Sequence, residues 1–238
     1  MSKRKPLSAM AVIIPAHNEE HLLTACLAAV DLAVFAARDS KRQVEVWVAL
    51  DSCDDKSAEI AHAAGVKAVT VDARNVGIAR QAAASSALQH FAELSPEQVW
   101  LAHTDADSVV PPNWLTHQAA LARKGADVVV GTVRPDFRDL SEQQTEAWWH
   151  THMPGVANGH VHGANLGTRA SAFLTAGGFQ PVPLHEDVYL VEAARRAGAR
   201  IEASDAAWVQ TSGRQVGRAP GGYADYLKGE LLPLAKSL

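Results

Sequence analysis

The sequence predicts an α/β fold in which a mostly parallel sheet is flanked by helices. Short apolar runs alternate with helical patterns through the first half of the 238-residue chain. Such alternation is typical of parallel strands joined by right-handed helical crossovers. Polar and acidic residues follow the apolar runs, at the sheet edge where α/β proteins bind their ligands. Because no repeat or low-complexity linker interrupts the chain, one domain is expected to span residues 1–238.

The first half supplies the clearest elements. The run Ala11-Val-Ile-Ile-Pro15 is apolar and ends in proline, as expected for a buried parallel strand. Beyond it, Leu23, Cys26 and Val30 recur at helical spacing. In order, the expected elements are a strand at 11–15, a helix at 20–37, a strand at 44–50, a helix at 56–64, a strand at 67–71, a helix at 78–91 and a strand at 99–103.

The second half is less regular, and its elements are expected to be shorter. A glycine-rich segment covers 155–167, and the residues after 212 are expected to form a mobile loop followed by a short helix. The remaining expected elements are a helix at 113–124, a strand at 128–131, a helix at 186–197 and late strands at 201–203 and 208–209.

Composition excludes several classes of protein. The formal net charge of −4 gives no electrostatic reason to expect nucleic acid as a partner. The two cysteines, Cys26 and Cys53, form no metal-binding or C-x-x-C motif, which favours a reduced, cytoplasmic protein. No signal peptide is visible, and no stretch approaches the ~20 apolar residues of a transmembrane segment.

Acidic residues recur at the ends of the expected strands. Asp51 ends the second strand, while Asp105 and Asp107 follow the fourth in a D-x-D pattern. Like charges held at one sheet edge repel each other unless a cation or ligand compensates them. Two oxygen ligands after a buried strand suit Mn²⁺ or Mg²⁺, which would neutralise a departing diphosphate. The alternative interpretation of D-x-D is a turn or a helix cap.

Six segments, taken together and in order, resemble family 2 glycosyltransferases of the GT-A fold, which are nucleotide-diphospho-sugar transferases. The resemblance implies a Rossmann-like sheet, a UDP- or GDP-type sugar donor and a hydroxyl acceptor of unknown identity. It also implies a donor-binding half at about 9–131 and an acceptor-binding half at about 132–238. The segments are Val12-Ile-Ile-Pro-Ala-His-Asn-Glu-Glu20, Leu50-Asp-Ser-Cys-Asp-Asp-Lys-Ser57, Asn75-Val-Gly-Ile-Ala-Arg80, Asp105-Ala-Asp107, Gly177-Gly-Phe179 and His185-Glu-Asp-Val188.

The same resemblance implies roles for individual residues. Asp105 is expected to bind the ribose, Asp107 the Mn²⁺ or Mg²⁺ ion, and Asp187 to act as the catalytic base, with Glu186 beside it. The donor is expected to contact a larger set, namely Pro15, Ala16, His17, Glu19, Asp51, Asn75, Gly77, Arg80 and Asp105.

The chemistry of sugar transfer agrees with a base at Asp187. Direct displacement needs a base within hydrogen-bond reach of the acceptor hydroxyl, opposite the leaving diphosphate, and it inverts the anomeric carbon. The carboxylate of Asp187 could instead only cap a helix and interact with its dipole. The helix near Ile78 offers amide donors to the same diphosphate, and Arg80 in its first turn offers a guanidinium.

Two departures from the family pattern limit the expected function. The Q-x-x-R-W motif and membrane helices of processive synthases are absent from the sequence, which argues against a chain-building enzyme. The usual D-D-G-S is replaced by Leu50-Asp-Ser-Cys53, which leaves the base preference of the donor open. Arg214 and Arg218 lie in a segment, 212–222, that either folds over a diphosphate or remains a solvated basic loop.

Two other enzyme classes are alternatives to this interpretation. His160 and His162, with His150, His152 and His185, could serve a zinc hydrolase, although no H-E-x-x-H motif is present. In a milder version, His160 or His162 lines the acceptor pocket or completes the metal shell. A sugar-1-phosphate nucleotidyltransferase would need a glycine-rich loop after the first strand, and none is present here. The pair Trp148-Trp149 suits a core position better than a sugar-stacking platform.

Overall fold

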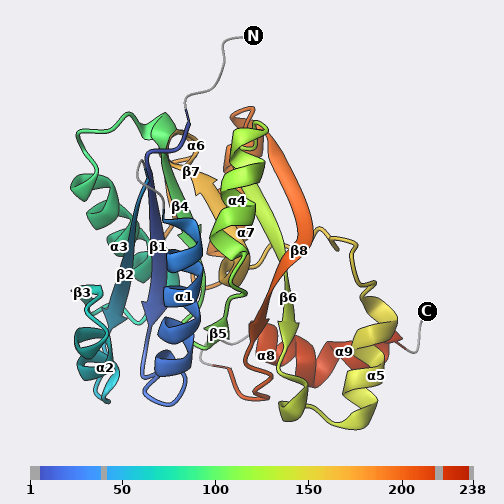
Figure 1. Cartoon of the computed structure of the whole chain (residues 1–238). Helices are drawn as coiled ribbons and strands as arrows, with labels where there is room; N and C mark the ends of the chain where they lie inside the picture. Colours follow the sequence, from blue (N-terminus) through green and yellow to red (C-terminus); the bar gives the residue numbers. More distant parts are fainter. Residues whose placement is uncertain (1–5, 39–41, 218–221, 236–238) are drawn as a thin grey trace.

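The computed structural model describes residues 6–38, 42–217 and 222–235. Its centre is one eight-stranded sheet in the order β3-β2-β1-β4-β7-β6-β8-β5, with helices on both faces (Figure 1). The strands are β1 (Ala9–Ala16), β2 (Gln43–Asp51), β3 (Lys67–Val71), β4 (Val99–His103), β5 (Ser108–Val109), β6 (Val128–Pro135), β7 (Leu166–Arg169) and β8 (Ile201–Thr211).

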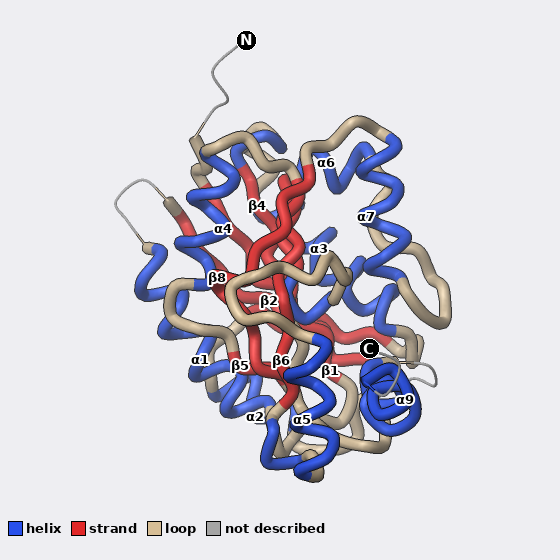
Figure 2. Tube along the Cα trace, turned by 90° about the vertical axis from the view of Figure 1, so that its right-hand side faces the viewer, coloured by secondary structure: helices blue, strands red, loops and turns tan. Residues whose placement is uncertain are grey.

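Helices cover both faces of this sheet. Helices α1 and α4 pack with α2 on one face, and α3, α6 and α7 pack on the other. Helix α5 lies with α9 to one side of the sheet (Figure 1), the side that faces the viewer in Figure 2. The helices are α1 (Leu23–Ala37), α2 (Ser57–Ala63), α3 (Val76–His90), α4 (Trp114–Arg123), α5 (Glu142–Thr151), α6 (Ala170–Thr175), α7 (Glu186–Arg196), α8 (Tyr223–Asp225) and α9 (Leu231–Ala235), with one π-helical turn at Tyr226–Glu230.

The expected mostly parallel sheet is confirmed. Strands β1, β2, β3 and β4 run parallel, and so do β6 and β8. Three pairings are antiparallel: β4 with β7, β6 with β7, and β5 with β8. The carboxyl ends of β1, β2 and β6 therefore reach the same edge of the sheet, the lower edge in Figure 1.

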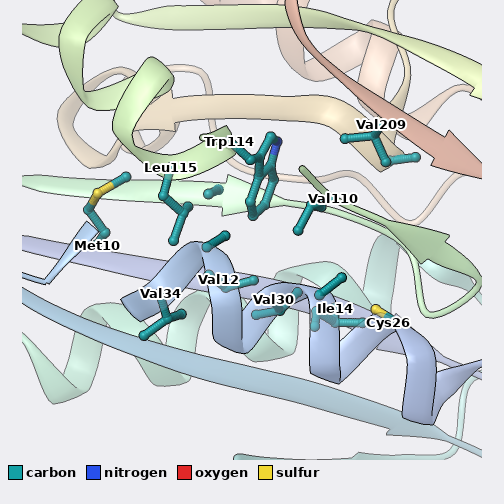
Figure 3. Packing of buried hydrophobic residues seen from close by; sticks show 14 of the residues in the cluster. Met10, Val12, Ile14, Cys26, Val30, Val34, Val110, Trp114, Leu115 and Val209 are labelled. Carbon is teal, nitrogen blue, oxygen red and sulfur yellow. The ribbon is translucent and has the colours of Figure 1, made fainter. Parts of the chain in front are cut away.

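Two hydrophobic layers hold the sheet between its helices. In Figure 3, Met10, Val12 and Ile14 of β1 lie beside Val30 and Val34 of α1, all of them within one buried cluster. Residues that alternate with these along β1 belong to the cluster on the opposite face. Both faces of β1 are therefore dry, as the continuous apolar run in the sequence predicted.

A third, smaller cluster joins α5 to the C-terminal segment. Trp148 of α5 is 1% exposed and packs with Leu227 and Leu231. Trp149, the next residue, is 41% exposed and stacks on Phe137. The expected core role of the tryptophan pair is therefore confirmed for Trp148. The helical pattern of α5 was not predicted from the sequence.

Other differences concern element boundaries and short strands. The helix expected at 20–37 begins at Leu23, and the two late strands are one continuous β8. Strand β6 extends to Pro135, so the boundary expected between residues 131 and 132 falls inside a strand. Strand β7 and helix α6 were not expected, and Arg218 lies outside the described residues. No helix in the described part of the chain has the length and apolar character needed to cross a membrane.

Candidate active site

The D-A-D segment directly follows β4 at the carboxyl edge of the sheet. The N–H of Thr104 donates to the carbonyl of Ile13 on β1 at 3.1 Å and holds the strand end in the sheet. In the turn that follows, Ser108 Oγ and Thr211 Oγ1 each donate to Asp107 Oδ1 at 3.3 Å. The Asp107 side chain is 12% exposed. Asp107 therefore lies in a fixed orientation at the edge where the sequence placed it.

Arg214, in the segment after β8, bridges two carboxylates at this edge. Its Nη2 lies 2.8 Å from Asp107 Oδ2, and its Nη1 lies 2.9 Å from Glu19 Oε1. Burial and the neighbouring Asp105 carboxylate raise the pKa of Asp107 to about 6, while Arg214 opposes that rise. No sequence pattern indicated that Arg214 would pair with these two carboxylates.

The oxygen donors at this edge fit a hard divalent cation. Asp107 and Glu19 already direct carboxylate oxygens at one cationic group, the guanidinium of Arg214. Mg²⁺ and Mn²⁺ commonly use one or two protein carboxylates and complete their shell with phosphate and water. Within the described residues, no group of three His, Cys, Asp or Glu side chains is arranged to hold a metal. Asp107 and Glu19 thus match the small number of protein carboxylates that such a cation commonly uses.

Asp51, the last residue of β2, is 3% exposed and uses both carboxylate oxygens within the protein. Oδ1 accepts the backbone N–H groups of Ala73 and Arg74, and Oδ2 accepts that of Asn75, all at 2.8 Å. Burial opposes ionisation of Asp51, but these donors outweigh it and lower the pKa of the carboxyl. Asp51 thus fixes the loop after β3. The sequence predicted a contact with the nucleoside and did not indicate this structural role.

The first-strand residues lie beside this loop. Pro15 and Ala16 are the last residues of β1 and pair in register with β2. The ring nitrogen Nδ1 of His17 forms a hydrogen bond with the carbonyl of Asp51 at 2.6 Å. The expected donor-binding residues Pro15, Ala16 and Asp51 therefore lie at neighbouring strand ends, although Ala16 and Asp51 are buried there.

Asn75 and Gly77 connect this donor side to the segment before α7. Asn75 Oδ1 caps α3 by accepting the N–H of Ile78 at 3.0 Å, and its Nδ2 donates to the Val182 carbonyl at 3.0 Å. A Cβ atom on Gly77 would lie 2.5 Å from the Gln180 carbonyl oxygen. Only glycine leaves room for this close approach, which brings the start of α3 against the acceptor half.

The acidic pair Glu186-Asp187 begins α7. His185, just before it, has a left-handed backbone with φ of 62°. Asp187 Oδ2 accepts the N–H of Gly163 at 2.6 Å, and Oδ1 accepts the N–H of Val188 at 2.7 Å. Burial and the adjacent Glu186 carboxylate raise the pKa of Asp187 to about 6. A carboxylate with this pKa is ionised at neutral pH and is a stronger base than an ordinary aspartate.

The 3-10 turn Gly163–Asn165, which supplies the N–H to Asp187, is itself anchored. Asn165 is 2% exposed, and its Nδ2 donates to the carbonyls of Thr132 at 2.9 Å and Ala207 at 3.0 Å. Its Oδ1 accepts the indole N–H of Trp114 at 2.9 Å. The side chain therefore ties the turn to both β6 and β8.

Arg80 lies beneath the site rather than on its surface. Its side chain is 2% exposed, and its Nη2 donates to Asp105 Oδ1. Nε donates to Glu186 Oε1 at 3.2 Å, and Nη1 donates to the Gly163 carbonyl at 3.2 Å. The guanidinium thus faces protein oxygens, whereas the sequence pointed to a diphosphate.

Left-handed backbone conformations mark the loops at this edge. Non-glycine residues with positive φ are uncommon and tend to cluster at functional sites. In the part of the chain that the structure describes, all of them lie in loops that follow β1, β2 and β3 or precede α7: Asn18, Ser52, Arg74 and His185.

The sequence of this chain matches a known protein family. Residues 11–173, about two thirds of the chain, match the family model described as Glycosyl transferase family 2. The chain belongs to this family. The family 2 match includes β1, β2, α3 and the D-A-D segment, and it ends within α6.

Two kinds of relative accompany the family 2 match. A dolichyl-phosphate hexose transferase from Haloferax volcanii is 30% identical over 122 residues, which cover 51% of this chain and 46% of that protein. The chain thus spans about half the length of this curated relative. Among solved structures, residues 1–349 of S. aureus TarS with UDP-GlcNAc align with a TM-score of 0.65 at 17% identity, covering 96% of this chain and 66% of that one.

A second solved structure has a similar fold. The mannosyltransferase PcManGT from Pyrobaculum calidifontis, in complex with GDP-Man and Mn²⁺, aligns with a TM-score of 0.62 at 17% identity. The alignment covers 98% of this chain and 74% of that one. These structural matches confirm the expected GT-A fold for this family 2 chain.

Among residues 6–38, 42–217 and 222–235, no three histidine, cysteine or acidic side chains gather as a zinc site would require. His160 is exposed, and its ring centroid lies 6.2 Å from that of His162. His162 contacts Tyr223 edge to face at 5.7 Å, and burial lowers its pKa to about 4. His162 directly precedes Gly163, whose N–H donates to Asp187, and its place in an acceptor pocket stays a prediction. The sequence raised this possibility, but only the fold brings Tyr223 to it.

Proposed function

We propose that this chain transfers a hexosyl group from a nucleotide-diphosphate-sugar to a hydroxyl acceptor, by direct displacement with inversion. One observation carries the proposal: Asp107 and Asp187, from opposite halves of the chain, are linked through Asp105, Arg80 and Gly163. A site of this kind has a carboxylate for the leaving-group side and a second carboxylate for the acceptor side. The family 2 match supports the same reaction class.

The donor half would hold the nucleoside diphosphate across the ends of β1 and β2. Pro15 and His17 are half-buried at these strand ends, Ala16 lies buried between them, and Asp51 keeps the neighbouring loop in place. Asp107, with Glu19 beside it, would hold Mn²⁺ or Mg²⁺. The bound cation would neutralise the negative charge that builds on the departing diphosphate.

Asp187 would act as the general base. As the acceptor oxygen forms its bond to the anomeric carbon, its proton passes to a carboxylate oxygen of Asp187, and the bond from that carbon to the diphosphate breaks with its electron pair. The N–H groups of Gly163 and Val188 hold the carboxylate in one orientation. A fixed base within hydrogen-bond reach of its proton contributes about 10²–10⁴-fold to the rate.

The comparisons guide the choice of donor and acceptor to test. TarS was solved with UDP-GlcNAc and PcManGT with GDP-Man, which supports UDP- and GDP-sugars as first candidates. The Haloferax relative is named for dolichyl phosphate, so polyprenyl phosphate belongs in the acceptor panel beside simple alcohols. Cys26 and Cys53 are free thiols, which supports a reducing compartment such as the cytoplasm.

A thermal-shift screen followed by product analysis tests the proposal. UDP-, GDP- and dTDP-sugars are compared with and without Mn²⁺, because a ligand that binds the folded state raises the melting temperature. The donor that shifts the protein is then incubated with the acceptor panel, and the anomeric configuration of the product is read by NMR. Retention of configuration would rule out direct displacement by the acceptor oxygen with Asp187 as its base. The absence of any sugar transfer from a bound donor would rule out the transferase itself.

A further inference from the structure

Arg80 is a buried cation whose partners come from three separate segments. Asp105 belongs to the D-A-D turn, Gly163 to the turn before β7, and Glu186 to the start of α7. The ring of Phe179 covers the guanidinium, with its centroid 5.9 Å from Arg80 Cζ. Four of the segments that the sequence singled out therefore meet at this one side chain.

These partners connect the two halves of the candidate site. On one side, Arg80 orients Asp105, two residues before Asp107. On the other, it holds the carbonyl of Gly163, whose own N–H donates to Asp187. Its contact with Glu186 fixes the residue that precedes Asp187. The base is thus held from both its neighbour and its hydrogen-bond donor, and both of these contact the same guanidinium.

Two glycines allow the backbone to pack closely against Arg80 and its partner Glu186. A Cβ atom on Gly163 would lie 2.7 Å from Arg80 Cζ, and a Cβ on Gly77 would lie 3.2 Å from the Cβ of Glu186. Both glycines therefore permit approaches that another residue would block. A planar guanidinium can serve three acceptors in fixed directions, whereas the ammonium of lysine is a point charge on a flexible stem.

We infer that Arg80 is the positioning residue that sets the proposed base Asp187 against the donor-side Asp105, and that it touches neither substrate. This inference rests on the proposed function. A displaced base loses rate steeply, because misplacement by about 1 Å can cost 10²-fold. Arg80→Lys keeps the charge but loses the fork, so its turnover should fall by about 10- to 100-fold.

Arg169 provides a matched control at the opposite edge of the sheet. Its side chain is 3% exposed, and its Nε lies 3.5 Å from Asp127 Oδ1. It donates to backbone carbonyls, among them that of Ala122 at 2.9 Å, and it lies over Trp100 at 5.8 Å from the ring centroid. Arg169→Lys should therefore destabilise the fold much as Arg80→Lys does, but leave turnover within about twofold, because its bonds to the carbonyls of Ala122 and Ala126 and its pairing with Trp100 lie at the edge of the sheet opposite the candidate site.

A double-mutant cycle with Asp187→Asn separates positioning from general damage. Turnover is followed as release of nucleoside diphosphate from the donor, with water as acceptor, at a temperature where every variant is folded by circular dichroism. If Arg80 acts through Asp187, then Arg80→Lys should slow the Asp187→Asn enzyme by less than about threefold. Arg169→Lys should have the same small effect in both backgrounds. If Arg80→Lys lowered turnover by the same factor in the wild-type and in the Asp187→Asn enzyme, the inference would be overturned.

Hydrogen exchange at the Gly163 amide gives a readout that does not depend on turnover. Its N–H donates to Asp187, so Arg80→Lys should lower its protection by about tenfold or more, while Arg169→Lys leaves it unchanged. Unchanged protection in Arg80→Lys would also overturn the inference. If Arg80→Lys does not fold, Glu186→Gln takes its place in both experiments, because it weakens the contact between Arg80 and residue 186.

These outcomes separate the inference from the proposed function. A wild-type protein that transfers no sugar, or an Asp187→Asn variant with wild-type turnover, would overturn the proposed reaction or its base. Multiplicative losses in an active enzyme would overturn only the positioning role of Arg80.

Discussion

The pH dependence of Asp187 makes the sharpest test of the proposed base. Its pKa is raised to about 6 by burial and by the Glu186 carboxylate. Only the ionised carboxylate accepts a proton, so turnover should rise with pH and level off above about 7. With a pKa of about 6, roughly a tenth of the molecules are ionised at pH 5 and roughly nine tenths at pH 7. Turnover at pH 5 should therefore be about a tenth of its plateau value.

The same raised pKa has a consequence for stability. Unfolded aspartate has a pKa of about 3.9, so between about pH 4 and 6 the folded protein binds more protons at this site than the unfolded chain. The folded state is therefore favoured at low pH, and this contribution is lost as the pH rises through about 6. A shift of about two units corresponds to at most about 3 kcal/mol of destabilisation at pH 7.5.

Asp187→Asn should remove both the pH dependence of turnover and that of stability. The variant keeps the shape of the side chain but cannot ionise, so its turnover should fall by about 10²–10⁴-fold, with donor affinity nearly unchanged. The amide of asparagine cannot accept both the N–H of Gly163 and that of Val188, so the variant loses one acceptor at every pH. Relative to the wild type, its free energy of unfolding should nevertheless rise by up to about 3 kcal/mol between pH 4 and pH 7.5, because only the wild type carries the titrating carboxyl. Urea denaturation and steady-state turnover across pH 5–8 measure the two quantities. A variant that keeps the acid limb of the wild-type profile would refute the assignment, because the titrating group would then lie elsewhere.

Three further predictions concern the donor side. Asp107→Ala should abolish Mn²⁺-dependent nucleotide binding in calorimetry while the circular dichroism spectrum stays that of the wild type; metal-dependent binding that survived would contradict its role. Asp51→Ala leaves the N–H groups of 73–75 without their acceptor, so the free energy of unfolding should fall by about 1–3 kcal/mol and donor affinity should drop with it. Arg214→Ala should raise the Mn²⁺ affinity of the nucleotide-free protein, measured by electron paramagnetic resonance, because the guanidinium that competes for Asp107 and Glu19 is gone; a weaker or equal affinity would show that the two cations do not compete.

The sequence predicted the donor half of the fold well because its signals there are local. The strands at 67–71 and 99–103 have the expected boundaries, and the second is a short, mostly apolar run buried along its whole length. Parallel strands buried on both faces carry this signal without help from the rest of the chain. Strand β7 and helix α5 escaped prediction, because β7 has only four residues and α5 buries only one face against the C-terminal segment.

The candidate site, too, contains residues that local patterns predict and residues that they do not. Asp105, Asp107 and Asp187 could be found because each lies at an element boundary in a recurrent pattern. The contacts of Arg80 with Glu186 and of Arg214 with Glu19 join residues 106 and 195 positions apart. No local pattern encodes such pairs. The sequence could therefore nominate residues for the site, while the division between surface residues and buried supports emerged only from the fold.

The strand order also determines how this protein can be divided. Strand β7, from the second half of the chain, lies between β4 and β6, and the two-residue β5 pairs with β8 at the far end of the sheet. A fragment that ends near residue 131 would leave the β4 edge open and would bring β6 without either of its neighbours. Open strand edges are prone to aggregation, so such a fragment should not fold as an independent unit. Exchange of donor or acceptor segments between relatives would therefore have to be made through loops within the intact sheet, and not by joining two half-proteins end to end.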